Sequence, residues 1–337
     1  MKQVSVALIL LVILVVAALG SLLLGRYPVG FHDMVNFCVW LFKEGPSARE
    51  QEMRLLENIF LQIRLPRIIG AVLVGSALSV SGAAFQSMFI NPLVSPGLLG
   101  VLAGASFGAA LSMVFFKSFL AVQISAFAFG CAAVALAMML ARFYEGDSLL
   151  MLILGGIVSG AFFTALLSIV KYMADPYDQL PAIVFWLMGG LSSISNKTLV
   201  VASGPILASM AALMALTPYM NALSMGDEEA RSLGVRVGLI RGVLIVCATL
   251  MSALTVVMAG IIGWVGLVVP HITRMVVGPD NRTLIPAAAI IGALYLLAMD
   301  DLSRLLFSVE IPLGILTALC GIPFFVLVLK HARKGWG

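Results

Sequence analysis

The sequence is short of charged residues. Of its 337 residues only 11% are Asp, Glu, Lys or Arg, whereas 61% are hydrophobic. Soluble domains contain about 25% charged and about 45–50% apolar residues. A water-soluble fold of this length could not bury so much apolar surface. The composition therefore excludes an ordinary soluble domain and predicts a membrane protein.

The chain also lacks the short alternating segments of a lipid-facing β-barrel. Its apolar runs are continuous, and a helix needs roughly 20 such residues to cross a bilayer. These runs predict an all-α polytopic membrane protein, with one transmembrane domain over residues 1–337 and a first helix that is not cleaved. The eighth and ninth spans are short, which is typical of transport pathways. The ten expected spans are 4–24, 66–89, 98–117, 119–142, 149–171, 198–217, 240–262, 263–278, 284–299 and 313–330.

Nucleotide-binding and metal-binding motifs are missing as well. The dipeptide Gly-Lys does not occur, which excludes a phosphate-binding loop of the G-x-x-x-x-G-K-[ST] type. The three histidines are far apart and the four cysteines form no C-x-x-C pair. We therefore expect no enzymatic activity, no cofactor and no metal site in this chain. Work on a solute would have to draw its energy from a partner or from an ion gradient.

Ionisable residues are scarce inside the expected spans. The cores of the first seven are almost free of charge, and Arg274 lies near an end of the short eighth. Gradient-driven carriers usually keep ionisable residues within their spans for ion coupling. The pattern argues against a proton-driven or sodium-driven secondary transporter, which remains the alternative from another class together with a non-transporting scaffold.

The polar stretch 218–239 lies between two expected spans and contains a short charged, amphipathic segment. Asp227, Glu228 and Glu229 follow Gly226 and would occupy the first turn of a short helix, where the helix dipole favours anions. Ala230 and Leu233 would form its apolar face, and Gly234 would end it. Such a helix at the membrane surface could dock into a groove on a soluble partner, and a solvated loop is the alternative.

Residues 224–235, SMGDEEARSLGV, resemble the coupling-helix segment of the FecCD family of importer permeases. The blocks 63–100, 260–282 and 300–325 resemble the other family blocks in the same order, so the resemblance covers about residues 63–330. It implies a type II ABC importer permease with ten helices per subunit and no part in nucleic-acid binding. The implied partners are a second copy of the chain, two cytoplasmic ATPase subunits that hold ATP and magnesium, and a periplasmic or lipid-anchored substrate-binding protein.

Lys and Arg divide evenly between the two sides of the expected topology, so their count does not orient the chain. The resemblance does, because a coupling segment must face the cytoplasm, where ATP is. Both termini would then be cytoplasmic, in a bacterial or archaeal inner membrane. The stretches 26–65 and 300–312 would lie outside.

The resemblance also assigns roles to individual residues. Arginines that meet acidic residues of the binding protein would orient docking, although snorkelling at a helix end is the alternative. The inner gate would lie in the cytoplasmic turn before the fifth span. Residues at the inner end of the second span and in the turn after it would line the path, or only satisfy broken backbone. Asp175, Tyr177 and Asp178 face outside without an assigned role. The expected sets are Gly226, Asp227, Glu228, Glu229, Ala230, Leu233 and Gly234 for coupling, Arg64, Arg67 and Arg304 for docking, and Asp147, Ser148, Gln86, Asn91 and Pro92 for the gate or path.

The cargo is the least determined property. The resemblance favours a metal chelate, either an iron–siderophore or haem, because most family members carry these. Cobalamin and a molybdate or tungstate oxyanion are the open alternatives.

Overall fold

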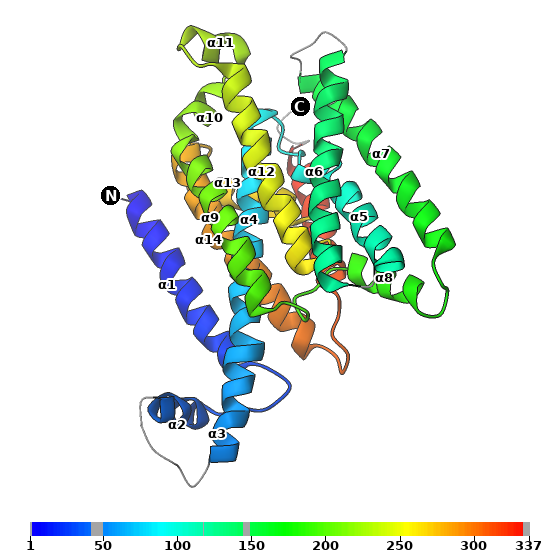
Figure 1. Cartoon of the computed structure of the whole chain (residues 1–337). Coiled ribbons are helices and arrows are strands. Elements are labelled where there is room, and N and C mark those ends of the chain that lie inside the picture. Colours follow the sequence, from blue (N-terminus) through cyan, green and yellow to red (C-terminus); the bar gives the residue numbers. More distant parts are fainter. Residues whose placement is uncertain (1, 42–49, 117, 144–148, 333–337) are drawn as a thin grey trace.

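A computed structural model describes residues 2–41, 50–116, 118–143 and 149–332 (Figure 1). Every regular element in these ranges is helical. The spanning-type helices are α1 (Lys2–Leu23), α4 (Leu65–Met88), α5 (Val101–Phe115), α6 (Phe119–Phe143), α7 (Leu149–Met173), α9 (Asn196–Ala215), α12 (Val237–Ala259), α13 (Val265–Val277), α14 (Asn281–Leu305) and α15 (Leu313–Ala332). Between them lie α2 (Phe31–Leu41), α3 (Glu50–Glu57), the π-helix η1 (Asn58–Arg64), the 3-10 turn η2 (Pro96–Leu99), α8 (Gln179–Leu187), α10 (Thr217–Leu223) and α11 (Asp227–Ser232).

The ten predicted spans correspond one for one to ten of these helices. Seven described helices are long and apolar enough to cross a membrane, and one of them runs without a break through α3, η1 and α4 over Gln51–Met88. The other three, α5, α13 and α15, are shorter apolar helices. The predicted all-helical polytopic fold is confirmed.

The prediction of a short ninth span was wrong. We expected residues 284–299, but α14 extends over 25 residues to Leu305. It continues because Asp300, Asp301 and Arg304 are paired within the protein, so these charges need not lie in water. In the stretch 26–65, which was expected only to lie outside, the described residues include the helices α2, α3 and η1.

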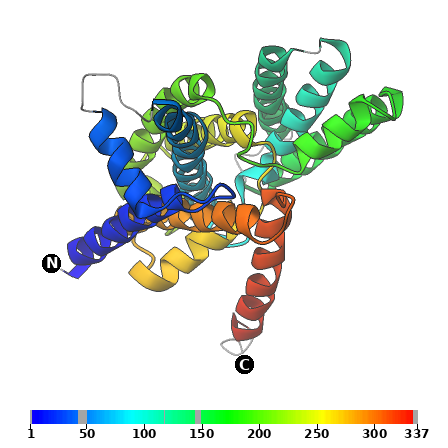
Figure 2. The same cartoon turned by 90° about the horizontal axis from the view of Figure 1, so that it is seen from below.

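Helix α4 lies at the centre of the bundle and α1 at its rim (Figure 2). In an apolar stretch of 18 residues within the helix that contains α4, 89% of the residues are buried. The corresponding share in α1 is 6%. Small residues make this possible, because Gly, Ala and Ser let helix backbones approach closely in lipid. Helices α5, α6 and α7 form a lobe on one side of α4, and α15 projects from another (Figure 2).

Helices α4 and α14 pack along each other in opposite directions. They touch backbone to backbone at Gly75 and Gly292, where a Cβ added to either glycine would collide with the carbonyl group of the other. Gly82 meets the backbone of Gly266 in α13 in the same way. The beginning of α4 lies by the end of α14, and the end of α4 lies by the beginning of α14. The two helices therefore form one tightly packed antiparallel pair.

One sequence pattern has a packing role only. Residues 104–108 read Gly-Ala-Ser-Phe-Gly, which matches the G-x-S-x-G pattern of hydrolase nucleophiles. Such a nucleophile needs a strand-to-helix turn, but these residues lie inside α5. The Ser106 hydroxyl donates to the Leu102 carbonyl at 2.6 Å, and Gly104 and Gly108 meet the backbone of α6. The pattern serves helix packing.

Candidate functional site

The segment formed by α10 and α11 lies at one end of the molecule, opposite α2 and α3 (Figure 1). Gly226 precedes α11 with a φ of +120°, a conformation that glycine adopts at little cost. At the other end Gly234 has a φ of +80°. Its N–H and that of Val235 donate to the carbonyls of Arg231 and Ala230 at 2.9 and 3.0 Å, which is a Schellman ending. The predicted short helix is present, and Gly234 ends it as expected.

The two faces of α11 differ in chemistry. Ala230 is fully buried, whereas Glu228 and Glu229 are exposed. Leu233 was predicted to share the apolar face with Ala230, but it is 64% exposed, as is Met225 just before the helix. Protein interfaces have an apolar centre and a polar rim. The exposed apolar side chains here resemble such a centre, and the exposed carboxylates beside them resemble such a rim. This surface suits a partner protein, and its coupling role stays a prediction.

Two attachments connect this segment to the spanning helices. The first is an ion pair between Asp227 at the start of α11 and Arg241 of α12, with Nη2 and Oδ1 2.7 Å apart. The Arg241 side chain is largely buried. A charge-assisted bond of this kind is shorter and stronger than a neutral one. It fixes the start of α11 against α12.

The second attachment, here called the inner node, consists of Ser87, Asn221, Asp280 and Asn281. Asn221 Oδ1 accepts from the backbone N–H and from Nδ2 of Asn281, at 2.9 and 2.8 Å. Asn221 Nδ2 donates to Asp280 Oδ1 at 2.7 Å, and Ser87 Oγ donates to Asn281 Oδ1 at 2.7 Å. The amide of Asn221 and the backbone N–H of Arg282 lower the pKa of Asp280. The node joins α10 to the end of α4 and the start of α14.

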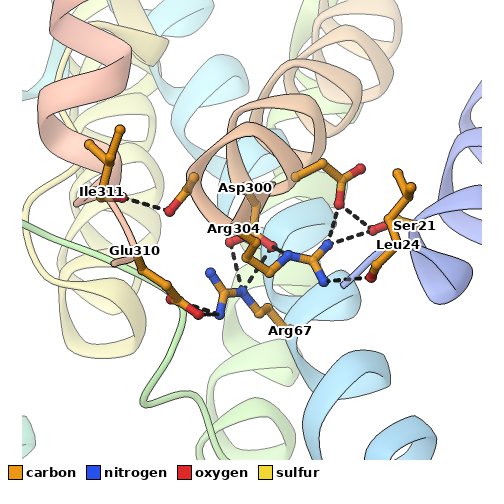
Figure 3. Close-up of polar contacts among 9 residues, drawn as sticks. Ser21, Leu24, Arg67, Asp300, Arg304, Glu310 and Ile311 are labelled. Carbon is orange, nitrogen blue, oxygen red and sulfur yellow. Dashed lines mark hydrogen bonds and ion pairs between the residues drawn. The ribbon is translucent and has the colours of Figure 1, made fainter. Parts of the chain in front are cut away.

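A second polar group, the outer cluster, lies at the other end of the α4–α14 pair (Figure 3). Arg67 of α4 donates from Nε to both carboxylate oxygens of Asp300, at 2.8 and 2.9 Å. Its Nη1 donates to both oxygens of Glu310, at 3.1 and 3.0 Å. Ser303 Oγ donates to the Ile311 carbonyl at 2.6 Å and holds the loop after α14 so that Glu310 meets Arg67. Asp300 is completely buried.

Arg304 completes the outer cluster. Its Nε lies 3.3 Å from Asp300 Oδ2, and its Nη2 meets Asp301 and donates to Ser21 Oγ at 3.0 Å. Its Nη1 donates to the Leu24 carbonyl at the end of α1, at 3.2 Å. The cluster therefore ties α1, α4, α14 and the loop after α14 together (Figure 3).

The three arginines predicted to dock a binding protein are all buried. Arg64, Arg67 and Arg304 are 3%, 7% and 7% exposed. Arg64 donates to the carbonyls of Leu22 and Tyr27 at 2.5 and 2.6 Å. Direct pairing with a partner would require these internal bonds to open, so docking through the three arginines stays a prediction.

The residues predicted for the gate or path are dispersed. Gln86 is buried and bridges α4 to α13, because its Nε2 donates to the Leu267 carbonyl and its Oε1 accepts from Arg274, both at 3.2 Å. Asn91 Oδ1 accepts from the Leu93 N–H at 2.9 Å in the turn after α4, which also contains Pro92. Asp147 and Ser148 lie outside the described residues.

The turn that contains Asp175, Tyr177 and Asp178 joins α7 to α8. Asp175 Oδ1 accepts from the backbone N–H groups of the other two, at 2.8 and 3.0 Å. Tyr177 is 93% exposed. Asp175 therefore stabilises the turn. The Tyr177 side chain lies at the surface.

Two cavities lie beside α8. A cavity of about 450 Å³, widely open to the surface, is bounded by the end of α8, residues 261–264 and α15, and apart from Trp264 its lining is aliphatic or backbone. A second of about 250 Å³ lies between α8 and the outer cluster, with Arg67 and Glu310 in its wall. Among the described residues no three His, Cys, Asp or Glu side chains come together to hold a metal ion.

A bundle of long apolar helices with a short exposed helix at one end fits a membrane permease. The chain belongs to the FecCD transport family, which it matches over residues 10–331. It is therefore an ABC importer permease, and its relatives are transport permeases rather than enzymes.

Named relatives match almost the whole chain. The molybdate import system permease protein MolB of Haemophilus influenzae is 38% identical, with 97% of this chain and 96% of that protein covered. The hemin transport system permease protein HmuU of Yersinia pestis is 36% identical, with 96% and 95% covered. A solved metal-chelate type ABC transporter in an inward-facing conformation is 36% identical and matches with a TM-score of 0.86, covering 97% of this chain and 99% of that one.

Sequence reasoning missed the inner node and the acidic half of the outer cluster. One signal was available, since Asp300 and Arg304 stand at i and i+4 on a helix, where opposite charges meet. Asn221 carried no comparable signal, because its partners lie 59 and 60 residues away in sequence.

Proposed function

We propose that two copies of this chain form the membrane pathway of an ATP-driven importer, and that separate ATPase subunits engage residues 218–239. The observation that carries the proposal is α11, which exposes Glu228 and Glu229 to solvent at one end of the bundle, with Leu233 exposed just after it. The full-length likeness to ABC permeases supports it.

The mechanism is alternating access. ATP binding closes the two ATPase subunits and displaces α11. The ion pair from Asp227 to Arg241 carries this displacement into α12. The permease has two arrangements, and ATP changes their relative populations because the ATPase binds them with different affinity.

The ATPase side is the cytoplasm, which orients the remaining parts. Helices α2 and α3 lie at the opposite end from α11 and therefore face outside, where a substrate-binding protein docks (Figure 1). The first turn of α1 and the last turns of α15 lie toward the α11 end, so both termini are cytoplasmic in an inner membrane.

The proposed cargo is a metal chelate. The wall of the 450 Å³ cavity is mostly apolar. A metal ion enclosed by an organic chelator presents a partly apolar surface, which can pass along such a wall. An oxyanion would find there few hydrogen-bond donors to replace its water, namely backbone N–H groups and the indole N–H of Trp264. The likeness to a molybdate permease favours an oxyanion as the second candidate.

Elemental analysis distinguishes an iron chelate from molybdate. Iron and molybdenum are measured in cells that lack this permease and in the parent strain, both grown under metal limitation. The proposal predicts a loss of iron alone. A loss of molybdenum would assign the oxyanion and reject the argument from the apolar wall.

A charge reversal tests the coupling surface. Glu228→Lys with Glu229→Lys should abolish uptake while the permease stays folded in the membrane, because the exposed surface that meets the ATPase changes sign. The matched control is Lys197→Glu, an exposed charge reversal at the start of α9, at the opposite end of the molecule. Wild-type uptake in the double variant would remove α11 from the proposed mechanism.

A further inference from the structure

The inner node and the outer cluster hold the same two helices. Ser87 and Asn281 lie at the inner ends of α4 and α14, and Arg67 and Asp300 lie at their outer ends. Between these ends the backbones touch at Gly75 and Gly292. A pair fixed at both ends and packed without intervening side chains moves as one body, because close-packed interiors transmit displacement rather than absorb it.

Asn221 joins this body to the α10–α11 segment, together with a longer bond of 3.5 Å from Ser224 Oγ to the Ser87 carbonyl. Its carbonyl oxygen has two lone pairs, and both accept N–H groups of Asn281. Its amide nitrogen donates to Asp280. If the Asn221 amide were flipped, its NH2 group would face the two N–H groups of Asn281, and no hydrogen bond could form. The Asn221 amide therefore has a single orientation here. The side chain of Asn221 is thus held firmly by the start of α14.

The connection from α11 to Asn221 is short. The turn between α10 and α11 is closed by backbone bonds from Met225 to Ala222 and from Gly226 to Leu223, at 3.1 and 3.2 Å. Ser224 Oγ also donates to the Met220 carbonyl at 2.9 Å, which keeps the turn on α10. A displacement of α11 therefore reaches α10 and Asn221 without a flexible linker.

We propose that Asn221 is a positioning residue that couples ATP-driven movement of α10–α11 to the α4–α14 pair, and through that pair to the outer cluster. This inference rests on the proposed function. It assigns Asn221 and Asp280 a role in transport that is separate from binding the ATPase, since neither belongs to the exposed face of α11.

An exchange of side chains between Asn221 and Asp280 tests the inference. Asn221→Asp keeps the shape and both acceptor bonds to Asn281, but it sets two carboxylates against each other. Asp280→Asn in the same chain restores a bond in the reverse direction, and asparagine is also a good residue at a helix start. The three variants are Asn221→Asp, Asp280→Asn and the double exchange.

The readout is the distance between spin labels on the outer side. Tyr177→Cys and Phe307→Cys provide two exposed attachment sites, one between α7 and α8 and one after α14. The native Cys38, Cys131, Cys247 and Cys320 are first replaced with Ser or Ala. The permease with its ATPase is measured before and after addition of MgATP with orthovanadate, and co-purified ATPase and melting temperature are recorded for each variant.

The inference predicts that the distance between the labels in the wild type changes when MgATP and vanadate are added. In Asn221→Asp this change should be lost although the ATPase is still bound. In the double exchange the change should return. A wild-type response in Asn221→Asp would overturn the role of Asn221, as would a stable double exchange without the response. Failure of the proposed function is distinct, because the wild type itself would then bind no ATPase or show no change.

Discussion

The two ends of the α4–α14 pair are held by different chemistry. The outer cluster sets two guanidinium groups against three carboxylates, and its Arg67, Arg304 and Asp300 are almost completely buried. The inner node uses amides, a hydroxyl and one exposed carboxylate. Breaking a buried ion pair costs about 3–5 kcal/mol, whereas a neutral hydrogen bond contributes about 0.5–1.5 kcal/mol. The difference predicts that both ends are held, but that the outer cluster contributes more to stability than the inner node does.

Asp300→Ala should have the largest effect, because it leaves Arg67 and Arg304 buried without their shared carboxylate. We expect a loss of about 3–5 kcal/mol in the free energy of unfolding, measured by thermal denaturation in nanodiscs. The control is Glu310→Gln, whose side chain is 34% exposed and whose loss should be about 1 kcal/mol or less. Equal stability of the two variants would contradict a fixed outer end.

Gly75→Ala disrupts the backbone contact between α4 and α14 that lies midway between the inner node and the outer cluster. The added methyl group would collide with the carbonyl of Gly292, and such overpacking costs about 1–3 kcal/mol. Gly204→Ala in α9 is the matched control, because a methyl group added there would meet no neighbouring atom within 4 Å. It should be neutral or stabilising by up to about 1 kcal/mol. If Gly75→Ala melted at the control's temperature, the pair would not be a rigid body.

Arg64→Lys separates an internal role from docking. One ammonium group cannot reach both the Leu22 and Tyr27 carbonyls as the guanidinium does, and the loss of one partly buried hydrogen bond costs about 1 kcal/mol. We expect a lower melting temperature with unchanged affinity for the binding protein. A salt-dependent loss of that affinity at an unchanged melting temperature would assign Arg64 to docking instead.

The smallest effect concerns pH at the inner node. The pKa of Asp280 is lower in the folded protein than in the unfolded chain. Its contribution to stability is therefore present above the unfolded pKa of about 4 and is lost as the pH falls through the folded pKa. Between pH 6 and pH 3 the wild type should lose slightly more thermal stability than Asp280→Asn. Identical pH profiles would show that the Asn221–Asp280 bond contributes nothing to folding.

The sequence was informative where the signal is local. Continuous apolar runs located all ten spanning-type helices, and three acidic residues between two glycines located α11. It failed where partners are distant. Arg67 and Asp300 are 233 residues apart, so nothing beside either residue indicated that both are buried. The same gap explains the misjudged length of α14, because its last turns look water-exposed until their partners are known.

Reconstitution into liposomes tests the central claim most directly. The permease, its ATPase and the binding protein are supplied with ATP or with a non-hydrolysable analogue, and trapped iron and molybdenum are measured. The account predicts accumulation only with ATP, and none when α11 carries the double charge reversal. Accumulation driven by a proton or sodium gradient without ATP would contradict it and assign the chain to the secondary transporters.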